Sequence, residues 1–97
     1  AGENPRSAAI RELREECGLV ADQVRDLGCI YPSVGYDDEI IYLYLATGLH
    51  QVQAQPDQGE FLTPELWHLE DLTSMALNGT LRDAKTVTAV LKTNFIR

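Results

Sequence analysis

Residues 3–19 read ENPRSAAIRELREECGL. Apolar side chains recur along this stretch at helical spacing, at Ala9, Ile10, Leu13 and Cys17. Pro5 suits the first turn of a helix, and Gly18 suits a C-terminal stop. The stretch therefore predicts a helix over about Pro5 to Cys17, with one apolar face and one heavily charged face.

Three glutamates crowd the charged face of this predicted helix, namely Glu12, Glu15 and Glu16. Glu12 and Glu16 are four residues apart, so their side chains lie on one stripe. Like charges at this spacing destabilise a helix unless water solvates them or hard cations neutralise them. The spacing by itself leaves both interpretations open.

The composition limits the class of protein. The chain has 97 residues and a formal net charge of -7, with 44% hydrophobic and 24% charged residues. This is enough for one small domain, and no window is apolar for long enough to span a bilayer. The first residues lack the pattern of a secretory signal. We therefore expect a soluble, cytoplasmic protein, with neither nucleic acid nor membrane as partner.

The middle of the chain predicts a long-looped β-hairpin. Its strands cover about Val24 to Ile30 and Glu39 to Thr47, and the turn-rich segment 31–38 separates them. Both alternating sets of the second strand are apolar or aromatic, which predicts cover on both faces and places Tyr42 and Tyr44 in the core. Residues 50–59 predict a polar surface loop.

The last third predicts a short strand at Leu66–Trp67, with Trp67 in the core, followed by two helices. The first helix covers Glu70 to Leu77 and is closed by Asn78-Gly79. The second is capped by Asp83, and its inward-facing side chains are predicted to be Ala84, Val87, Val90 and Leu91. Cys17 and Cys29 form no C-x-x-C pair and are predicted to be buried, reduced thiols.

A hairpin of this size is marginal unless more strands join it. We therefore expect either that the parent protein continues upstream of Ala1, or that the chain completes its sheet by pairing with another copy.

The first helix also resembles a known motif, the Nudix box, G-x5-E-x7-R-E-U-x-E-E-x-G-U, in which U is aliphatic. Glu3 is followed after seven residues by Arg11-Glu12 and Leu13, and then by the remaining specified positions Glu15, Glu16, Gly18 and Leu19. The opening glycine of the box would precede Ala1. The resemblance thus implies the C-terminal portion of a single Nudix domain over residues 1–97. Its expected fold is α+β, a partial α/β/α sandwich in which the Nudix helix precedes a β-hairpin, a short strand and two C-terminal helices.

The resemblance also implies the chemistry of the glutamates. Glu12 and Glu16 take the main metal-ligand roles, and Glu15 is a further ligand or a catalytic partner of the attacking water. Arg11 and Glu3 are structural. The expected cofactor is Mg²⁺ or Mn²⁺, which takes oxygen ligands and activates water beside a phosphate.

Two further segments resemble ADP-ribose pyrophosphatases. Residues 31–41 are similar to a Y-x-S-P-G-x-x-D/S-E loop, although Val34 stands in the place of its proline, and residues 79–86 are similar to a G-x-I-x-D-A-K-T helix entry. The implied reaction is hydrolysis of ADP-ribose to AMP and ribose 5-phosphate by a homodimer. Because Val34 departs from the pattern, nucleotide sugars and dinucleotides stay open as substrates.

The remaining site residues are candidates from loops. Relatives often take a general base from a distant loop, which points to Glu60, with Asp57 second. Tyr36 and Glu39 are candidate substrate-binding residues, Tyr36 by stacking on a base. His50 and His68 are not paired at ligand spacing and are expected on the surface or at a helix cap. The alternative function is a non-catalytic Nudix-fold module that binds a nucleotide or a protein, or a truncated chain that is inactive alone.

Overall fold

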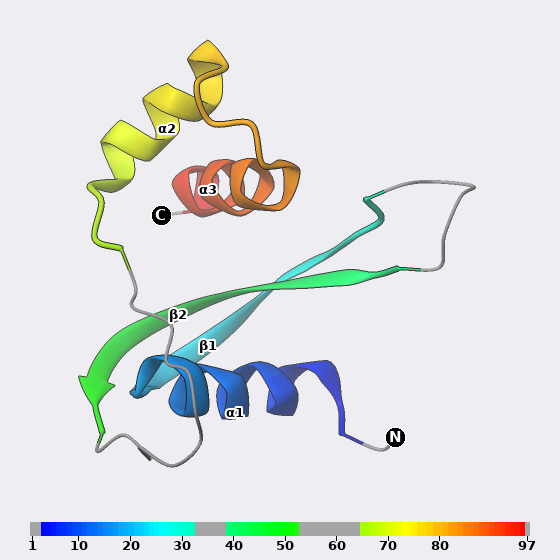
Figure 1. Cartoon of the computed structure of the whole chain (residues 1–97), viewed down its shortest axis with the longest axis vertical. Coiled ribbons are helices and arrows are strands. Elements are labelled where there is room, and N and C mark those ends of the chain that lie inside the picture. The colour runs from blue at the N-terminus through cyan, green and yellow to red at the C-terminus, as the bar shows by residue number, and fades with distance from the viewer. Residues whose placement is uncertain (1–2, 33–38, 53–64, 97) are drawn as a thin grey trace. The chain divides into compact units, whose positions relative to one another are not determined.

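The computed structural model describes residues 3–32, 39–52 and 65–96. Its elements, shown in Figure 1, are α1 (Pro5–Cys17), β1 (Leu19–Ile30), β2 (Ile41–Gln51), α2 (Leu69–Asn78) and α3 (Ala84–Ile96). The two strands pair in one antiparallel sheet. The predicted α+β class is therefore confirmed. Among the described helices, none has the length and apolar character that crossing a membrane requires.

The chain divides into two compact units, and both strands run through both of them. The first unit comprises residues 1–26 and 46–65, and the second comprises residues 27–45 and 66–97. Helix α1 belongs to the first unit, whereas α2 and α3 belong to the second. The single domain expected over residues 1–97 stays a prediction.

The first unit joins α1 to the far end of the hairpin. The amide of Val52 donates to the carbonyl of Gly18 at 2.9 Å, so strand pairing reaches the residue that ends α1. From α1, Nη2 of Arg6 donates to the carbonyl of Val24 in β1 at 3.1 Å. The first bond fixes the chain at the C-terminal end of α1, and the second links the N-terminal turn of α1 to β1.

The second unit holds the buried hydrophobic side chains of the described structure, which are Leu27, Leu43 and Val90. Helices α2 and α3 pack against each other. Nζ of Lys92 in α3 donates to the carbonyl of Leu27 in β1 at 2.6 Å. This core is small, as expected for a short chain with a two-stranded sheet.

The strands are longer than predicted. β1 begins at Leu19 rather than near Val24, and β2 continues to Gln51, so His50 lies in a strand and not in a loop. Hydrogen bonding between β1 and β2 extends both strands over residues whose own strand preference is weak.

The short strand predicted at Leu66–Trp67 is wrong, because these residues have irregular backbone. Two apolar residues form no strand without a neighbouring strand to complete the hydrogen-bond ladder.

Several side chains are more exposed than the sequence predicts. Trp67 is 52% exposed and Tyr42 is 48% exposed, while Tyr44 is half-buried, because two strands do not cover both faces of β2 in the described residues. Cys17 and Cys29 are both free, as predicted, but Cys29 is exposed. Ala84 is also exposed, since it is the first residue of α3 and projects at the helix end.

Candidate metal centre

Helix α1 begins and ends at residues whose chemistry favours those positions. Asn4 precedes it, and its Oδ1 accepts from the amide of Ser7 at 2.7 Å, while Pro5 occupies the first helical position. Gly18 follows it with φ 67°, a left-handed conformation that favours glycine. The predicted limits of this helix are confirmed, so the glutamates between them have a helical register.

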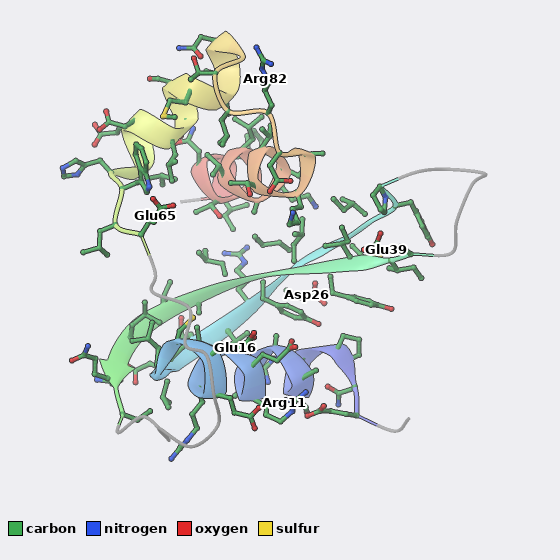
Figure 2. All side chains as sticks on the ribbon, in the orientation of Figure 1. Arg11, Glu16, Asp26, Glu39, Glu65 and Arg82 are labelled. Carbon is green, nitrogen blue, oxygen red and sulfur yellow. The ribbon has the colours of Figure 1, made fainter. Side chains whose placement is uncertain are left out.

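Helical geometry places four of the charged residues of α1 on two neighbouring stripes. Since an α-helix turns by roughly 100° per residue, Arg11 and Glu15 share one stripe. Glu12 and Glu16 share a second stripe, roughly 100° around the helix from the first. Figure 2 shows Arg11 and Glu16 projecting on different sides of α1. Glu15 is three residues from Glu12, so the three predicted metal ligands lie within roughly 100° of the helix circumference, with Glu15 at the edge nearest Arg11.

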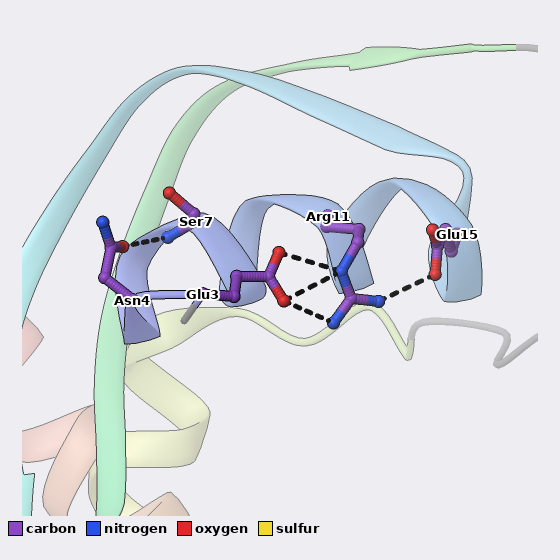
Figure 3. A network of polar contacts seen from close by, with 5 residues as sticks. All are labelled: Glu3, Asn4, Ser7, Arg11 and Glu15. Atoms are coloured by element: carbon purple, nitrogen blue, oxygen red, sulfur yellow. Dashed lines mark hydrogen bonds and ion pairs between the residues drawn. The ribbon is translucent and has the colours of Figure 1, made fainter. Parts of the chain in front are cut away.

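The first stripe is an ion-pair network, drawn in Figure 3. Nε of Arg11 donates to both carboxylate oxygens of Glu3, at 3.2 and 3.0 Å, and its Nη2 donates to Oε1 of Glu3 at 3.0 Å. Nη1 of the same guanidinium donates to Oε1 of Glu15 at 2.9 Å. One arginine thus connects the residue before the helix cap to a glutamate near the helix C-terminus. The structural role predicted for Arg11 and Glu3 agrees with this geometry.

These contacts shift two pKa values. The pKa of the Glu3 carboxyl lies below its ordinary value, chiefly because it accepts hydrogen bonds from Arg11. The pKa of Arg11 is raised, first by its hydrogen bonds to Glu3 and then by that to Glu15. All three side chains are nearly half exposed, so solvent screens the network and its strength comes from the forked geometry.

The second stripe carries the carboxylates of Glu12 and Glu16. Within the described residues, the side chains of Glu12 and Glu16 have no hydrogen bond or ion pair, and both are exposed. The same part of the structure holds no group of three His, Cys, Asp or Glu side chains placed to bind a metal. Two adjacent free carboxylates nevertheless fit Mg²⁺ or Mn²⁺, which take oxygen ligands and complete their shell with water and substrate phosphate. Glu15 fits less well, because its Oε1 already accepts a hydrogen bond from the guanidinium of Arg11.

The other candidate residues lie apart from this helix in the sequence. Glu39 is exposed two residues before β2, in the second unit. Tyr36, Val34, Asp57 and Glu60 lie outside the described residues, so their predicted roles stay predictions. His68 precedes α2, and its carbonyl accepts from the amides of Asp71 and Leu72, so it caps the helix through its backbone.

One polar pair was missed by the sequence interpretation. Nε2 of His50 in β2 lies 2.8 Å from Oδ1 of Asp22 in β1, and both side chains are more than half exposed. No local sequence pattern indicates this pair, because it depends on the register of two strands and its members are 28 positions apart. The expectation that His50 is a surface residue is confirmed.

Comparison with known proteins identifies the same motif. A family model described as the NUDIX domain matches residues 1–90. A methanol dehydrogenase activator from Bacillus methanolicus is 38% identical over 91 residues, which are 92% of this chain and 49% of that protein. An ADP-ribose pyrophosphatase from Bacillus subtilis is 34% identical over 91 residues, with the same two shares.

A second ADP-ribose pyrophosphatase, from Mycobacterium tuberculosis, is 48% identical over 52 residues, which are 54% of this chain and 25% of that protein. The chain spans about half the length of the first two relatives. Because the family model covers nearly all of the chain, including the helix that carries the paired glutamates, this protein belongs to the NUDIX domain family.

Proposed function

We propose that the chain forms the cation site of a hydrolase that cleaves the diphosphate of ADP-ribose or of a similar nucleoside diphosphate derivative. With ADP-ribose, water attacks one phosphorus, the bond to the bridging oxygen breaks, and the products are AMP and ribose 5-phosphate. The observation that carries the proposal is the pair of exposed carboxylates, Glu12 and Glu16, which have no partner among the described residues and lie on the helix of the NUDIX match.

The proposed cofactor is Mg²⁺, with Mn²⁺ equivalent in its choice of ligands. Glu12 and Glu16 would hold it. When bound, such a cation offsets the phosphate charge and lowers the pKa of a bound water. The other residues of α1 have supporting roles: Glu3 and Arg11 hold Glu15, and the Gly18 turn connects the helix to β1.

The general base is proposed to be Glu60, with Asp57 as the second candidate. Either carboxylate is able to accept the proton of the attacking water, which the intervening amide of Gln58 is unable to do. Tyr36 and Glu39 are proposed to contact the nucleoside part of the substrate. For the whole protein we further propose a cytoplasmic homodimer.

ADP-ribose is the first substrate to test, because two relatives carry that name in their description. Nucleotide sugars and dinucleotides come next, because Val34 departs from the loop pattern of ADP-ribose pyrophosphatases. All of these substrates share a diphosphate flanked by a nucleoside, which is the group that a carboxylate-bound divalent cation recognises.

The test is chromatographic detection of AMP after incubation of the chain with ADP-ribose and Mg²⁺. Glu16→Gln and Glu12→Gln remove one ligand charge each and are expected to abolish product formation. Glu70→Gln is the matched control, because Glu70 is an exposed helical glutamate in α2, outside the motif. It is expected to leave the rate unchanged.

Each other outcome selects a different function. If ADP-ribose persists while a nucleotide sugar or a dinucleotide is cleaved, the substrate assignment is wrong and the reaction class stands. If no diphosphate is cleaved but a nucleotide and Mn²⁺ still bind, the chain is either a non-catalytic binding module or a part of its protein that is inactive alone, and the same assay on the longer natural protein separates the two. Product formation that survives Glu16→Gln would contradict the proposed cation site.

A further inference from the structure

We propose that Arg11 limits the cation affinity of this site by holding Glu15 away from the cation, so that strong cation binding requires the diphosphate as well. The inference rests on the proposed function, since it concerns the same cation. The observation behind it is that one guanidinium pairs with two carboxylates, one of which belongs to the motif.

The guanidinium of Arg11 holds both partners at once. Nε and Nη2 face the carboxylate of Glu3, and Nη1 faces Glu15 from the opposite end of the fork. Arginine is suited to this arrangement because its donors are planar and fixed relative to one another. Glu3 keeps Arg11 in place at one end, and this leaves Nη1 directed at Glu15. Glu3 therefore acts on the cation site through Arg11.

The consequence is a division of the three motif glutamates. Oε1 of Glu15 accepts from Nη1 of Arg11 at 2.9 Å, so a cation that binds through this carboxylate meets the positive charge of a guanidinium beside it. Among the residues that the structure describes, no side chain pairs with Glu12 or Glu16, which leaves both as ligands. The affinity of an oxygen-ligand site rises with the number of charged ligands, so two ligands bind a cation more weakly than three.

The substrate diphosphate supplies charged oxygen ligands in place of Glu15. Its oxygens are hard, charged ligands, and Mg²⁺ commonly binds through one or two carboxylates together with substrate phosphates. Binding of the cation and of the diphosphate is then mutually reinforcing, and each raises the affinity of the other by the same factor. Arg11 is thus a positioning residue that makes the site depend on its substrate.

The experiment measures binding rather than turnover. Mn²⁺ is titrated into the chain and the free ion is followed by electron paramagnetic resonance, with and without methylenediphosphonate, a diphosphate whose bridge is not hydrolysed. Arg11→Gln frees Glu15 and is expected to tighten Mn²⁺ binding about tenfold without the diphosphonate, as one more charged ligand implies. It is also expected to reduce the gain in affinity on adding diphosphonate.

Three variants separate this effect from a change in net charge. Arg14→Gln removes the same charge from the same helix, and Arg14 has no side-chain partner in the described residues, so a change of less than about twofold is expected. Glu15→Gln is expected to change affinity little in the native background. It is expected to cancel the tightening in the Arg11→Gln background, since coupled residues deviate from additivity.

The outcomes distinguish this inference from the proposed function. Equal affinities for Arg11→Gln and Arg14→Gln, with native Mn²⁺ binding that depends on Glu12 and Glu16, would overturn the role of Arg11 and leave the proposed site intact. Absence of Mn²⁺ binding in every variant would overturn both. Arg11→Lys provides a second test should the glutamine variant unfold, because lysine keeps the charge and lacks the fork. A tightening smaller than that of Arg11→Gln is then expected.

Discussion

Replacing Gly48 with alanine is expected to destabilise the hairpin more than the same change at other glycines. Gly48 lies in β2 with φ 66°, and an added Cβ would lie 2.5 Å from Oδ2, 2.7 Å from Cβ and 2.8 Å from Cγ of Asp22. The left-handed backbone costs about 1 to 2 kcal/mol for a residue with a Cβ. Displacing Asp22 at its root, rather than at its flexible end, adds about 1 to 3 kcal/mol. The expected loss in the free energy of unfolding is therefore about 2 to 5 kcal/mol.

The assay is urea unfolding followed by circular dichroism, with two matched alanine variants as controls. Gly79 has φ 87° and no atom within 4 Å of an added Cβ, and Gly18 has φ 67° with the carbonyl oxygen of Val52 at 3.5 Å. Both controls carry only the backbone cost of about 1 to 2 kcal/mol. If Gly48→Ala is no less stable than Gly79→Ala, the close approach of Asp22 to Gly48 is refuted.

Three further changes test other contacts. The pKa of Glu3 lies below its ordinary value of 4.5. Its contribution to stability is therefore complete above pH 4.5 and is lost as the pH falls through the lower pKa of the folded state. An NMR titration of Glu3 should show the low midpoint, and Arg11→Gln should restore an ordinary midpoint. Asp83→Ala should lower the thermal midpoint because the amide of Lys85 loses its acceptor, whereas Asp83→Asn should retain most of it; equal losses would contradict the cap. Val90→Ala should cost about 2 kcal/mol in urea unfolding because two buried methyl groups are lost, and an unchanged midpoint would place Val90 outside the core.

The helices were predictable because their signals are local. Pro5 and Gly18 stand next to the residues where α1 begins and ends, and the observed limits match the predicted ones. The limits of α2 differ from the prediction by only one residue at each end. The agreement is close because Asn78-Gly79 is a local stop signal. Asp83 caps α3 as expected, with Oδ1 accepting from the amide of Lys85 at 3.3 Å.

The strands and the contacts of the site were less predictable because they depend on distant residues. The extent of β1 is set by Val52, which no window around Gly18 contains. The spacing of Glu12, Glu15 and Glu16 predicted a carboxylate cluster but not its division, since that depends on where the Arg11 side chain extends. Glu3 is eight residues from Arg11, slightly more than two helical turns, so a pairing rule for neighbouring turns does not include it.

Because each unit combines segments that are far apart in the sequence, synthesis on the ribosome determines when each unit can be completed. Helix α1 is made before the hairpin, and the Val52 amide that bonds to Gly18 follows that residue by 34 positions, about 2 to 7 seconds at common rates of synthesis. A helix of 13 residues is marginal in water on its own, even with both ends capped. Lys92, which bonds to the Leu27 carbonyl, emerges 65 residues after that carbonyl. Neither unit is therefore complete early in translation, and the second unit lacks its Lys92 to Leu27 hydrogen bond until α3 has been made.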